Sequence, residues 1–485
     1  MGGASVLLVS PASSQGGEWA AGPRVKPELV SVWSHLRREG SRVELLDAEC
    51  DADAASQADA ASQADAMSQA DATSQAGAAD LVALACLSPL QYGAALAVAR
   101  RVRETRPQAV TAVFGQHVTV RPDDFSAGAA DGLFDWVVQG DAEVSLSQIA
   151  ADAVAAGREE RACRVGVGEP LPLTEQTLPD YAGYPCVREG LASLGVYLSR
   201  GCQYHSALCY AGPSGGQWRA FPPETAFGLL VRLEGLRPHE IAVLDPTFGL
   251  DTGWRAAVLG RLADVERRAV PLSLTARPEA FARRDVDAVY RGRLHLHLSI
   301  GSLSPSLLAA LEVPRPRQTL ERILDLIRYA NAKGVPAELD LVFGQPGETR
   351  ATAAETLDTL EELIGSFPNT SLRPVARAWA YVPFGDVETD VKAPARRFGT
   401  AIVHPEWWKD DVPSFAAAHA VVPSADLLDL PPGDDSYWRP RFEAVAAAFA
   451  AKLTQEARRG LRSHEGVGSM ADHVPHGFWR EPRWH

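Results

Sequence analysis

Short apolar segments alternate with amphipathic segments through the first third of the chain, and this alternation restricts the fold more than any other feature. An apolar stretch at residues 6–9 is followed by a helix-like stretch at about 27–38 and a second apolar stretch at 42–47. Further strands are expected at residues 81–86, 110–114 and 136–138, with a helix at about 94–104. Strands separated by helices form a parallel sheet that is covered on both faces. The pattern therefore predicts an α/β, doubly wound domain over residues 1–160.

The loops that follow these strands are candidates for ligand binding, because parallel α/β sheets bind ligands beyond the carboxyl ends of their strands. The residues of interest in those loops are Ser10, Pro11, Ser88, Leu90, Gln91, Tyr92, Gly115, Gln116, His117, Val118, Gly140, Asp141 and Glu143. Residues 51–80 instead repeat a short Ala-Ala-Ser-Gln-Ala-Asp unit, which cannot bury a core of its own. We expect this repeat to form an insertion between the second and third strands.

A second series of strand-like and helix-like segments follows a linker at residues 161–192. Strands are expected at about residues 197–202, 241–245, 271–277, 294–301, 337–344 and 372–382. Amphipathic segments separate them, and one of these segments places Leu320, Ile323 and Ile327 on a single helical face. Six such units form an open, partial (β/α)6 barrel over residues 193–390, with its site at the carboxyl ends of the strands.

Two cysteines directly after the first strand of this series point to metal chemistry. Cys202 and Cys209 lie in one loop, and their thiolates are soft ligands suited to iron–sulfur clusters. The hydroxyl of Ser206, which lies between them, must lose a far less acidic proton to bind iron. A cluster held by two cysteines alone would be labile, and a ring nitrogen of His205 could serve as a further ligand. The candidate metal ligands are therefore Cys202, His205, Ser206 and Cys209.

This loop resembles the cluster loop of the radical S-adenosylmethionine (AdoMet) enzymes, in which three cysteines in a C-x3-C-x2-C array hold a four-iron cluster. The first-domain loops resemble those of the cobalamin-binding domain of one subfamily. Residues 245–248, 299–304 and 344–349 also resemble family motifs in the expected order. The chain is thus identified, over about residues 1–390, as a member of the cobalamin-binding radical AdoMet superfamily, with Ser206 in place of the middle cysteine.

The resemblance implies a role for each group of candidate residues. The first-domain loop residues would bind cobalamin, without a protein imidazole because no D-x-H-x-x-G motif is present. AdoMet contacts are implied for Leu208, Asp245, Arg277, Ser299, Gly301, Leu303, Val342, Gly344 and Val382. Candidates for proton transfer at the barrel mouth are Tyr204, Asp245, Asp340 and Tyr381, with His295 and His297 as further candidates.

Three departures from the family pattern leave several functions open. Ser206, Leu208 and Leu303 stand where the family usually has a cysteine, an aromatic residue and a Glu or Gln. They favour an enzyme of specialised-metabolite biosynthesis that uses cobalamin and AdoMet without a conventional cluster. Its reaction would be methyl or alkyl transfer, or cobalt-mediated ring formation on the aminobutyrate portion of AdoMet.

The alternatives differ in the fate of the cluster. One is a conventional radical C-methyltransferase with a third ligand other than cysteine or with Ser206 as an engineered replacement. In that enzyme the resemblance implies reductive cleavage of AdoMet to a deoxyadenosyl radical, methyl supply from methylcobalamin and a reductase partner. The other is a non-catalytic partner protein that binds cobalamin.

Composition narrows the class of partner. A net charge of −14 over 485 residues argues against a nucleic-acid-binding surface, which is normally basic. No apolar run approaches the roughly 20 residues that span a bilayer, and the N-terminus lacks a secretion pattern. We therefore expect a cytoplasmic protein with a small-molecule substrate. Residues 391–485, with a helix expected at 442–459, would form a small, mainly helical cap domain.

Overall fold

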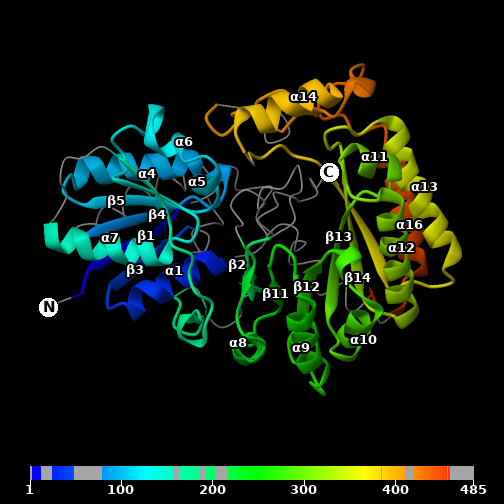
Figure 1. Ribbon diagram of the computed structural model, residues 1–485, viewed down its shortest axis with the longest axis horizontal. Helices are drawn as coiled ribbons and strands as arrows, with labels where there is room; N and C mark the ends of the chain where they lie inside the picture. The colour runs from blue at the N-terminus through cyan, green and yellow to red at the C-terminus, as the bar shows by residue number, and fades with distance from the viewer. Residues whose placement is uncertain are drawn as a thin grey trace.

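The computed structural model describes residues 3–11, 24–48, 79–156, 163–185, 187, 193–202, 217–383, 385–410, 419–455 and 457–458. Two parallel sheets stand next to each other, each with its own helices. Figure 1 shows the N-terminal sheet, in blue to cyan, beside the barrel sheet, in green to yellow. None of the described helices combines the length and the apolar character that crossing a membrane requires.

The first sheet has six parallel strands in the order β3-β1-β4-β5-β6-β7. The strands are β1 (Ser5–Ser10), β3 (Arg42–Asp47), β4 (Leu81–Ala85), β5 (Val110–Phe114), β6 (Trp136–Gln139) and β7 (Arg164–Val167). The helices beside them are α1 (Pro27–Arg38), α4 (Tyr92–Thr105), α5 (Gln116–Val120), α6 (Asp123–Ser126) and α7 (Glu143–Ala156). The order reverses between β1 and β4, and doubly wound sheets bind ligands at such a switch point.

Both faces of this sheet are buried, which explains its continuous apolar strands. In β1, Val6 packs in one apolar cluster with Leu29 of α1, whereas Leu7 packs in a second cluster with Leu96 of α4. Successive residues of a strand point to opposite faces, so apolar residues on both faces require helices on both sides. The predicted α/β, doubly wound sheet is confirmed.

The second sheet has seven parallel strands in the order β15-β14-β13-β12-β11-β8-β2. The strands are β2 (Arg24–Val25), β8 (Ser193–Val196), β11 (Ile241–Val243), β12 (Leu272–Ala276), β13 (His295–Gly301), β14 (Ala337–Phe343) and β15 (Leu372–Ala378). Its helices are α8 (Pro223–Gly235), α9 (Thr252–Ala263), α10 (Arg283–Arg291), α11 (Pro305–Ala310), α12 (Pro316–Lys333) and α13 (Arg350–Ser366). The linear strand order is that of an open barrel, as predicted, but the strand expected at 197–202 is replaced in this sheet by β8 at Ser193–Val196.

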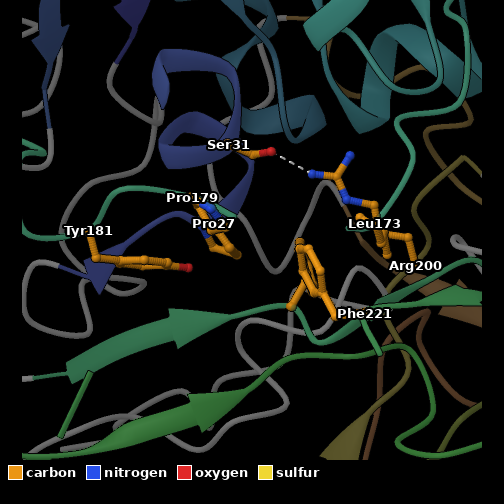
Figure 2. A pocket seen from close by; sticks show the side chains of 8 residues that line it. Pro27, Ser31, Leu173, Pro179, Tyr181, Arg200 and Phe221 are labelled. Carbon is orange, nitrogen blue, oxygen red and sulfur yellow. Dashed lines mark hydrogen bonds between the residues drawn. The ribbon is translucent and has the colours of Figure 1, made fainter. Parts of the chain in front are cut away.

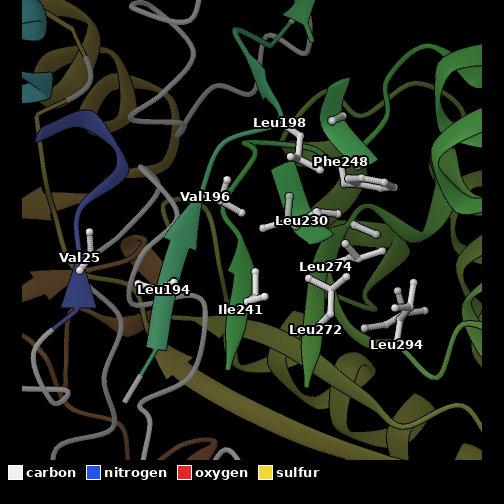
Figure 3. Close-up of a cluster of buried hydrophobic side chains, with 14 of the residues drawn as sticks. Val25, Leu194, Val196, Leu198, Leu230, Ile241, Phe248, Leu272, Leu274 and Leu294 are labelled. Carbon is white, nitrogen blue, oxygen red and sulfur yellow. The ribbon is translucent and has the colours of Figure 1, made fainter. Parts of the chain in front are cut away.

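Strands β12 to β15 present apolar residues to the helices and alternate them with polar residues on the opposite side. In β14, Leu339 and Leu341 lie in the apolar cluster beneath the helices, and Glu338 and Asp340 alternate with them. Figure 3 shows the apolar side of β8, β11 and β12, with Leu230 of α8 among their side chains. Because side chains alternate along a strand, the other face of β12 to β15 carries polar side chains, whereas β11 places Ala242 in a small apolar cluster of its own.

Two short strands depart from the predicted division of the chain. β7 lies within the predicted linker at residues 161–192, yet it pairs with β6 at the edge of the first sheet. β2 belongs to the N-terminal part of the sequence, yet it pairs with β8 at the edge of the barrel sheet. Such short strands carry too little alternation to be found by periodicity. The first sheet therefore extends beyond residue 160, and the barrel sheet includes one strand from within residues 1–160.

The C-terminal residues pack in two places. α14 (Ala393–Phe398) and the antiparallel pair of β16 (Ala401–Ile402) and β17 (Val421–Val422) precede α16 (Arg439–Lys452). Trp407 and Trp408 lie in the apolar cluster of α4 in the first domain. α16 packs instead on α13 and β15 of the barrel, and Trp438 next to it stacks on Phe343 with ring centroids 4.5 Å apart. The helix expected at 442–459 thus begins and ends earlier, and almost all of the repeat at 51–80 lies outside the described residues.

Candidate functional site

A cavity of about 540 Å³ lies between the carboxyl-end loops of the two sheets. Its lining from the first sheet includes Gly115, Gln116, Gly140, Asp141 and Glu143. Its lining from the barrel side includes Tyr197, Ser199, Arg200, Gly201 and Pro246. The first set belongs to the loops predicted to bind cobalamin, and Gly201 directly precedes Cys202. The cavity thus brings part of the first predicted set against the barrel, while the predicted barrel residues are absent from the described lining, which includes their chain neighbours Gly201 and Pro246.

Gly115 holds the loop after β5 close to the loop after β4. Its φ of +122° lies in a region open to glycine, and a Cβ at this position would stand 2.5 Å from the carbonyl oxygen of Cys86. The backbone N–H of His117 donates to the same oxygen at 3.2 Å. A side chain at position 115 would therefore push apart two loops at the carboxyl end of the sheet.

The predicted residues in the loops after β1 and β4 do not line the cavity among the described residues, but they contact one another and neighbouring loops. Gln91 is buried, donates to the carbonyl oxygen of Pro11 at 2.8 Å and accepts from the N–H of Leu87 at 2.8 Å. Ser10 accepts from Lys26 Nζ at 3.0 Å. The remaining predicted positions in these loops are buried or bonded nearby: Leu90 and Tyr92 are buried, Tyr92 donates to the carbonyl oxygen of Asp124, and the Ser88 carbonyl accepts from the thiol of Cys86. These residues fix the loops to one another.

His117 and Val118 are fully buried, and neither is among the described residues that line the cavity. Nε2 of His117 lies 3.4 Å from Asp124 Oδ2, and the ring packs edge-on against Trp408 with centroids 5.3 Å apart. Burial lowers the pKa of His117, although Asp124 opposes this effect. His117, predicted from its loop to contact cobalamin, is thus placed in the core of the first domain.

Side chains of the first domain and of the barrel meet beside this cavity. We call this group the arginine bridge: Ser31, Asp141, Glu143, Arg200 and Arg219. Arg200 donates to Glu143 Oε1 at 2.7 Å and lies 3.2 Å from Asp141 Oδ1. Arg219 donates to Asp141 Oδ2 at 3.1 Å. Burial raises the pKa of Glu143, but the Arg200 guanidinium outweighs burial, so the pKa lies below its usual value. Glu143 is thus held as an anion by the barrel.

Ser31 of α1 completes the bridge. Its hydroxyl donates to Glu143 Oε1 at 2.6 Å and accepts from Arg200 at 2.8 Å. Figure 2 shows Ser31 facing the guanidinium of Arg200 beside a small pocket that Tyr181 and Phe221 also line. Nearby, the hydroxyl of Tyr197 donates to Glu28 of α1 at 2.6 Å. Side chains from α1, α7 and β9 (Ser199–Arg200) therefore converge next to Cys202.

Asp245 fixes the strand end from which the cysteine loop begins. Its Oδ1 accepts from the backbone N–H groups of Leu198 and Ser199 at 2.8 and 3.1 Å, and its Oδ2 accepts from the Ser199 hydroxyl at 2.5 Å. Burial raises the pKa of Asp245 to about 7, and these hydrogen bonds limit the shift. The predicted catalytic and AdoMet-binding roles of Asp245 stay predictions, while its contacts are those of a support for β9.

Cys202 is buried and follows Gly201, whose φ of +80° turns the chain at the end of β9. β9 pairs with β10 (Arg219–Ala220), so the chain between them leaves and returns at the same place. The predicted residues Tyr204, His205, Ser206, Leu208 and Cys209 lie outside the described residues. Within the described part of the chain, no group of three or more metal-ligating side chains comes together.

Most of the remaining barrel candidates lie at or beyond the carboxyl ends of their strands, whereas Asp340 lies at the middle of β14. Ser299 and Asp340 are register partners on β13 and β14, and Asp340 forms an ion pair with Arg377. Burial raises the pKa of Asp340, and Arg377 opposes the rise. The other predicted AdoMet contacts are placed as follows: Arg277 donates to Glu279, Gly301 and Gly344 have positive φ, Leu303 and Val382 are buried, and Val342 is partly buried.

Tyr381 lies at the border between the barrel and the first domain. It is fully buried, donates to Asp390 at 3.1 Å and accepts from Arg121 at 3.3 Å. Burial raises its pKa strongly, and Asp390 adds to this rise. Of the further candidates, His297 pairs with Glu338 through Nδ1 at 2.8 Å, and His295 begins β13. The described contacts of Tyr381 are those of a domain-joining residue.

Arg200 and Arg219 were not predicted from the sequence as functional residues. Arg200 stands directly before Gly201 and Cys202, so its place at a strand end was readable. Its partners Asp141 and Glu143 were identified, but as ligand contacts. Nothing in the sequence links positions so far apart, because an ion pair between two domains leaves no local periodicity.

Comparison with known proteins gives sequence relatives and fold relatives. No family model matches the chain. Curated tRNA-2-methylthio-N(6)-dimethylallyladenosine synthases match parts of it: that of Pelotomaculum thermopropionicum at 25% identity over 41% of this chain and 48% of its own, and that of Solibacter usitatus at 32% over 23% and 26%. The chain spans less than half the length of these curated relatives.

The fold resembles that of TsrM, a radical S-adenosylmethionine methyltransferase from Kitasatospora setae. The structure of TsrM with cobalamin and a [4Fe-4S] cluster matches with a TM-score of 0.59 and 17% identity over 79% of this chain and 76% of TsrM. The structure with tryptophan substrate and an AdoMet analogue matches with a TM-score of 0.58 and 17% identity over 78% and 74%. This chain therefore shares the fold of TsrM over about four fifths of its length.

Proposed function

We propose that this chain is an enzyme that binds cobalamin and AdoMet and acts on a small molecule of specialised metabolism, without a conventional three-cysteine cluster. The reaction would be methyl or alkyl transfer, or ring formation on the aminobutyrate portion of AdoMet. The observation that carries the proposal is the cavity in which Gly115, Gln116 and Gly140 of the first sheet face Gly201, next to Cys202. The fold shared with TsrM supports it.

The residues around the cavity fit a corrin. A volume of about 540 Å³ is in the usual range for small-molecule sites. Gly115 and Gly140, both with positive φ, allow a planar ligand to approach the backbone closely. The amide side chains of Gln116 and Gln139 line the cavity and can exchange hydrogen bonds with the amide groups of the corrin rim. Asp141 and Glu143 would act indirectly, because Arg200 and Arg219 already engage their carboxylates.

The barrel side fits a charged cosubstrate. Ser299 and Asp340 are neighbours on the polar face of β13 and β14. The left-handed Gly301 and Gly344 end or follow these strands and leave backbone groups accessible. When bound, cobalamin would supply a carrier for an alkyl group and AdoMet its source. The protein would position these groups through strand ends that Asp245 and Arg377 hold in place.

The cysteine loop decides between this proposal and its alternatives. Of the four candidate metal ligands, Cys202 alone lies among the described residues. Ser206 stands where the family has its middle cysteine. A conventional radical C-methyltransferase would require His205 or Ser206 to complete the cluster. A non-catalytic cobalamin-binding partner would require neither cluster nor turnover.

The test is metal analysis of the full chain, purified without oxygen and reconstituted separately with iron and sulfide and with hydroxocobalamin. We expect stoichiometric cobalt, little iron and consumption of AdoMet. Near four irons per chain, with deoxyadenosine released from AdoMet, would replace the proposal with the conventional radical enzyme. Cobalt without any turnover would leave the partner protein, and binding of neither metal would refute all three.

A further inference from the structure

We propose that Arg200 is a positioning residue that couples ligand binding in the cavity to the base of the Cys202 loop. The identity of the cavity ligand rests on the proposed function. The mechanical link rests only on the contacts of the arginine bridge. Two results are therefore separable: whether cobalamin binds, and whether Arg200 joins the two loops.

Both ends of the chain segment that carries Cys202 attach to one loop of the other sheet. Arg200 on β9 and Arg219 on β10 are register partners in an antiparallel pair. Each contacts Asp141, at 3.2 and 3.1 Å. The segment between β9 and β10 is thus anchored to the loop after β6 at its exit and at its return.

The strength of this attachment depends mainly on Arg200. The Glu143 side chain is 2% exposed and that of Arg200 is 16% exposed. Removing one member of a buried ion pair is costly, because the other charge stays buried without compensation. The planar guanidinium reaches Glu143 and Asp141 at once and also meets Ser31, whereas a lysine ammonium cannot reproduce that fork. Movement of the loop after β6 therefore requires movement of β9.

The same residues face the cavity. Asp141, Glu143, Arg200 and Arg219 all line it. A ligand that orders the loop after β6 must then also order β9 and β10, and linkage makes the effect reciprocal. Neither Asp141 nor Glu143 would need to touch the ligand for this coupling.

Hydrogen exchange of the peptides that contain β9 and β10, followed by mass spectrometry in the full chain, tests the coupling. Hydroxocobalamin is the probe, and its binding is measured separately by its visible spectrum. We expect saturating hydroxocobalamin to slow exchange at β9 and β10 about fivefold or more in the native chain. In Arg200→Gln the slowing should fall below about twofold at saturation, and Arg200→Lys should lie between.

Two further variants serve as controls for this experiment. Arg283→Gln, at an exposed barrel ion pair with Asp325, should behave like the native chain. Asp141→Asn leaves the Arg200–Glu143 contact in place and should weaken the slowing in part, which keeps the test available if Arg200→Gln fails to fold. Full slowing in Arg200→Gln would overturn the proposal, because the ligand would then act on β9 directly. Binding to the native chain without any slowing would overturn it as well.

A second arm needs no cobalamin. Arg200→Gln and Glu143→Gln should each speed exchange at β9 and β10. The exchange rate of the double variant should exceed that of the faster single variant by less than about twofold, because both substitutions remove the same Arg200–Glu143 contact. Multiplicative effects would overturn the bridge. If the native chain fails to bind hydroxocobalamin, the proposed function fails while this arm still decides the role of Arg200.

Discussion

The two sheets meet at one cavity with differently built strands. Every residue of β4 in the first sheet is buried, and the strand is apolar throughout. β14 in the barrel alternates Leu339 and Leu341 with Glu338 and Asp340. The first sheet is covered by helices on both faces, whereas the barrel sheet buries one face beneath helices and directs charged side chains to the other.

This difference indicates how each sheet would treat a ligand. At the first sheet, the described cavity lining includes glycines and amides, together with Asp141 and Glu143, which the barrel's arginines already engage. On the barrel face, Glu338 has its partners within the sheet: it contacts His297 Nδ1 at 2.8 Å and forms an ion pair with Arg373. Burial raises the pKa of Glu338, but these two partners outweigh it and lower the pKa. The charged side chains named here thus have partners at both surfaces, across the two sheets at the first and within one sheet at the second.

Replacing Arg377 by Met should have the largest effect, since it leaves the Asp340 carboxylate without its cation on the polar barrel face. We expect the free energy of unfolding to fall by about 4 kcal/mol, measured by denaturant titration. The double variant Asp340→Asn/Arg377→Met should lose clearly less, because both charges are gone. Equal losses would break the contrast between a charge-balanced barrel and an apolar first sheet.

Gly115→Ala tests the close approach of two loop backbones in the first sheet. The added Cβ meets the Cys86 carbonyl, and the φ of +122° disfavours any side chain, so we expect a loss of about 3 kcal/mol in unfolding free energy. Gly128→Ala is the matched control, since Gly128 also has positive φ but has open space around it, and should cost about 1 kcal/mol. Similar costs for the two would show that the close approach of the loops is unimportant.

Asp245→Asn tests the support of β9, where the barrel meets the first domain. Burial raises the pKa of Asp245 from 3.8 to about 7, so its stabilising contribution is full below pH 3.8 and is lost as pH rises through 7. Between pH 5.5 and 8 the native chain should lose about 2 kcal/mol relative to the variant, measured by paired denaturant titrations. The pairing cancels Glu348, whose pKa burial also raises to about 7. A pH-independent difference would contradict this assignment.

Arg283→Gln should have the smallest effect. Arg283 and Asp325 are 61% and 54% exposed on the outer surface of the barrel, where water screens the pair. We expect no resolvable change in the free energy of unfolding, measured by denaturant titration. A loss of unfolding free energy comparable to that of Arg377→Met would mean that exposed ion pairs, rather than the buried polar face, stabilise the barrel.

Much of the fold was predictable because strand and helix periods are local properties. The strand expected at 110–114 is observed at those residues, and the strand expected at 294–301 is observed at His295–Gly301. The strand expected at 372–382 ends at Ala378, since Trp379 and the residues after it turn to pack against the first domain. β2 and β7 were missed because strands this short are defined by their partners.

The candidate site was predictable only in part. Gly115, Gln116, Gly140, Asp141 and Glu143 were identified as loop residues at strand ends, and they line the cavity. His117 came from the same loop, yet helix α5 turns its ring into the core beside Asp124 and Trp408. Adjacent residues at a helix start point in different directions, so membership of a loop does not determine which side chain reaches a ligand.

The sequence by itself determined the two α/β units, the strand ends where a ligand could bind and the cysteine that follows β9. These follow from periodicity and from spacing along the chain. Only the tertiary structure decided that Arg200 and Arg219 hold Asp141 and Glu143, and that Asp245 supports β9. Those contacts join residues distant in sequence, and their energies depend on burial and distance, which exist only once the two sheets have packed together.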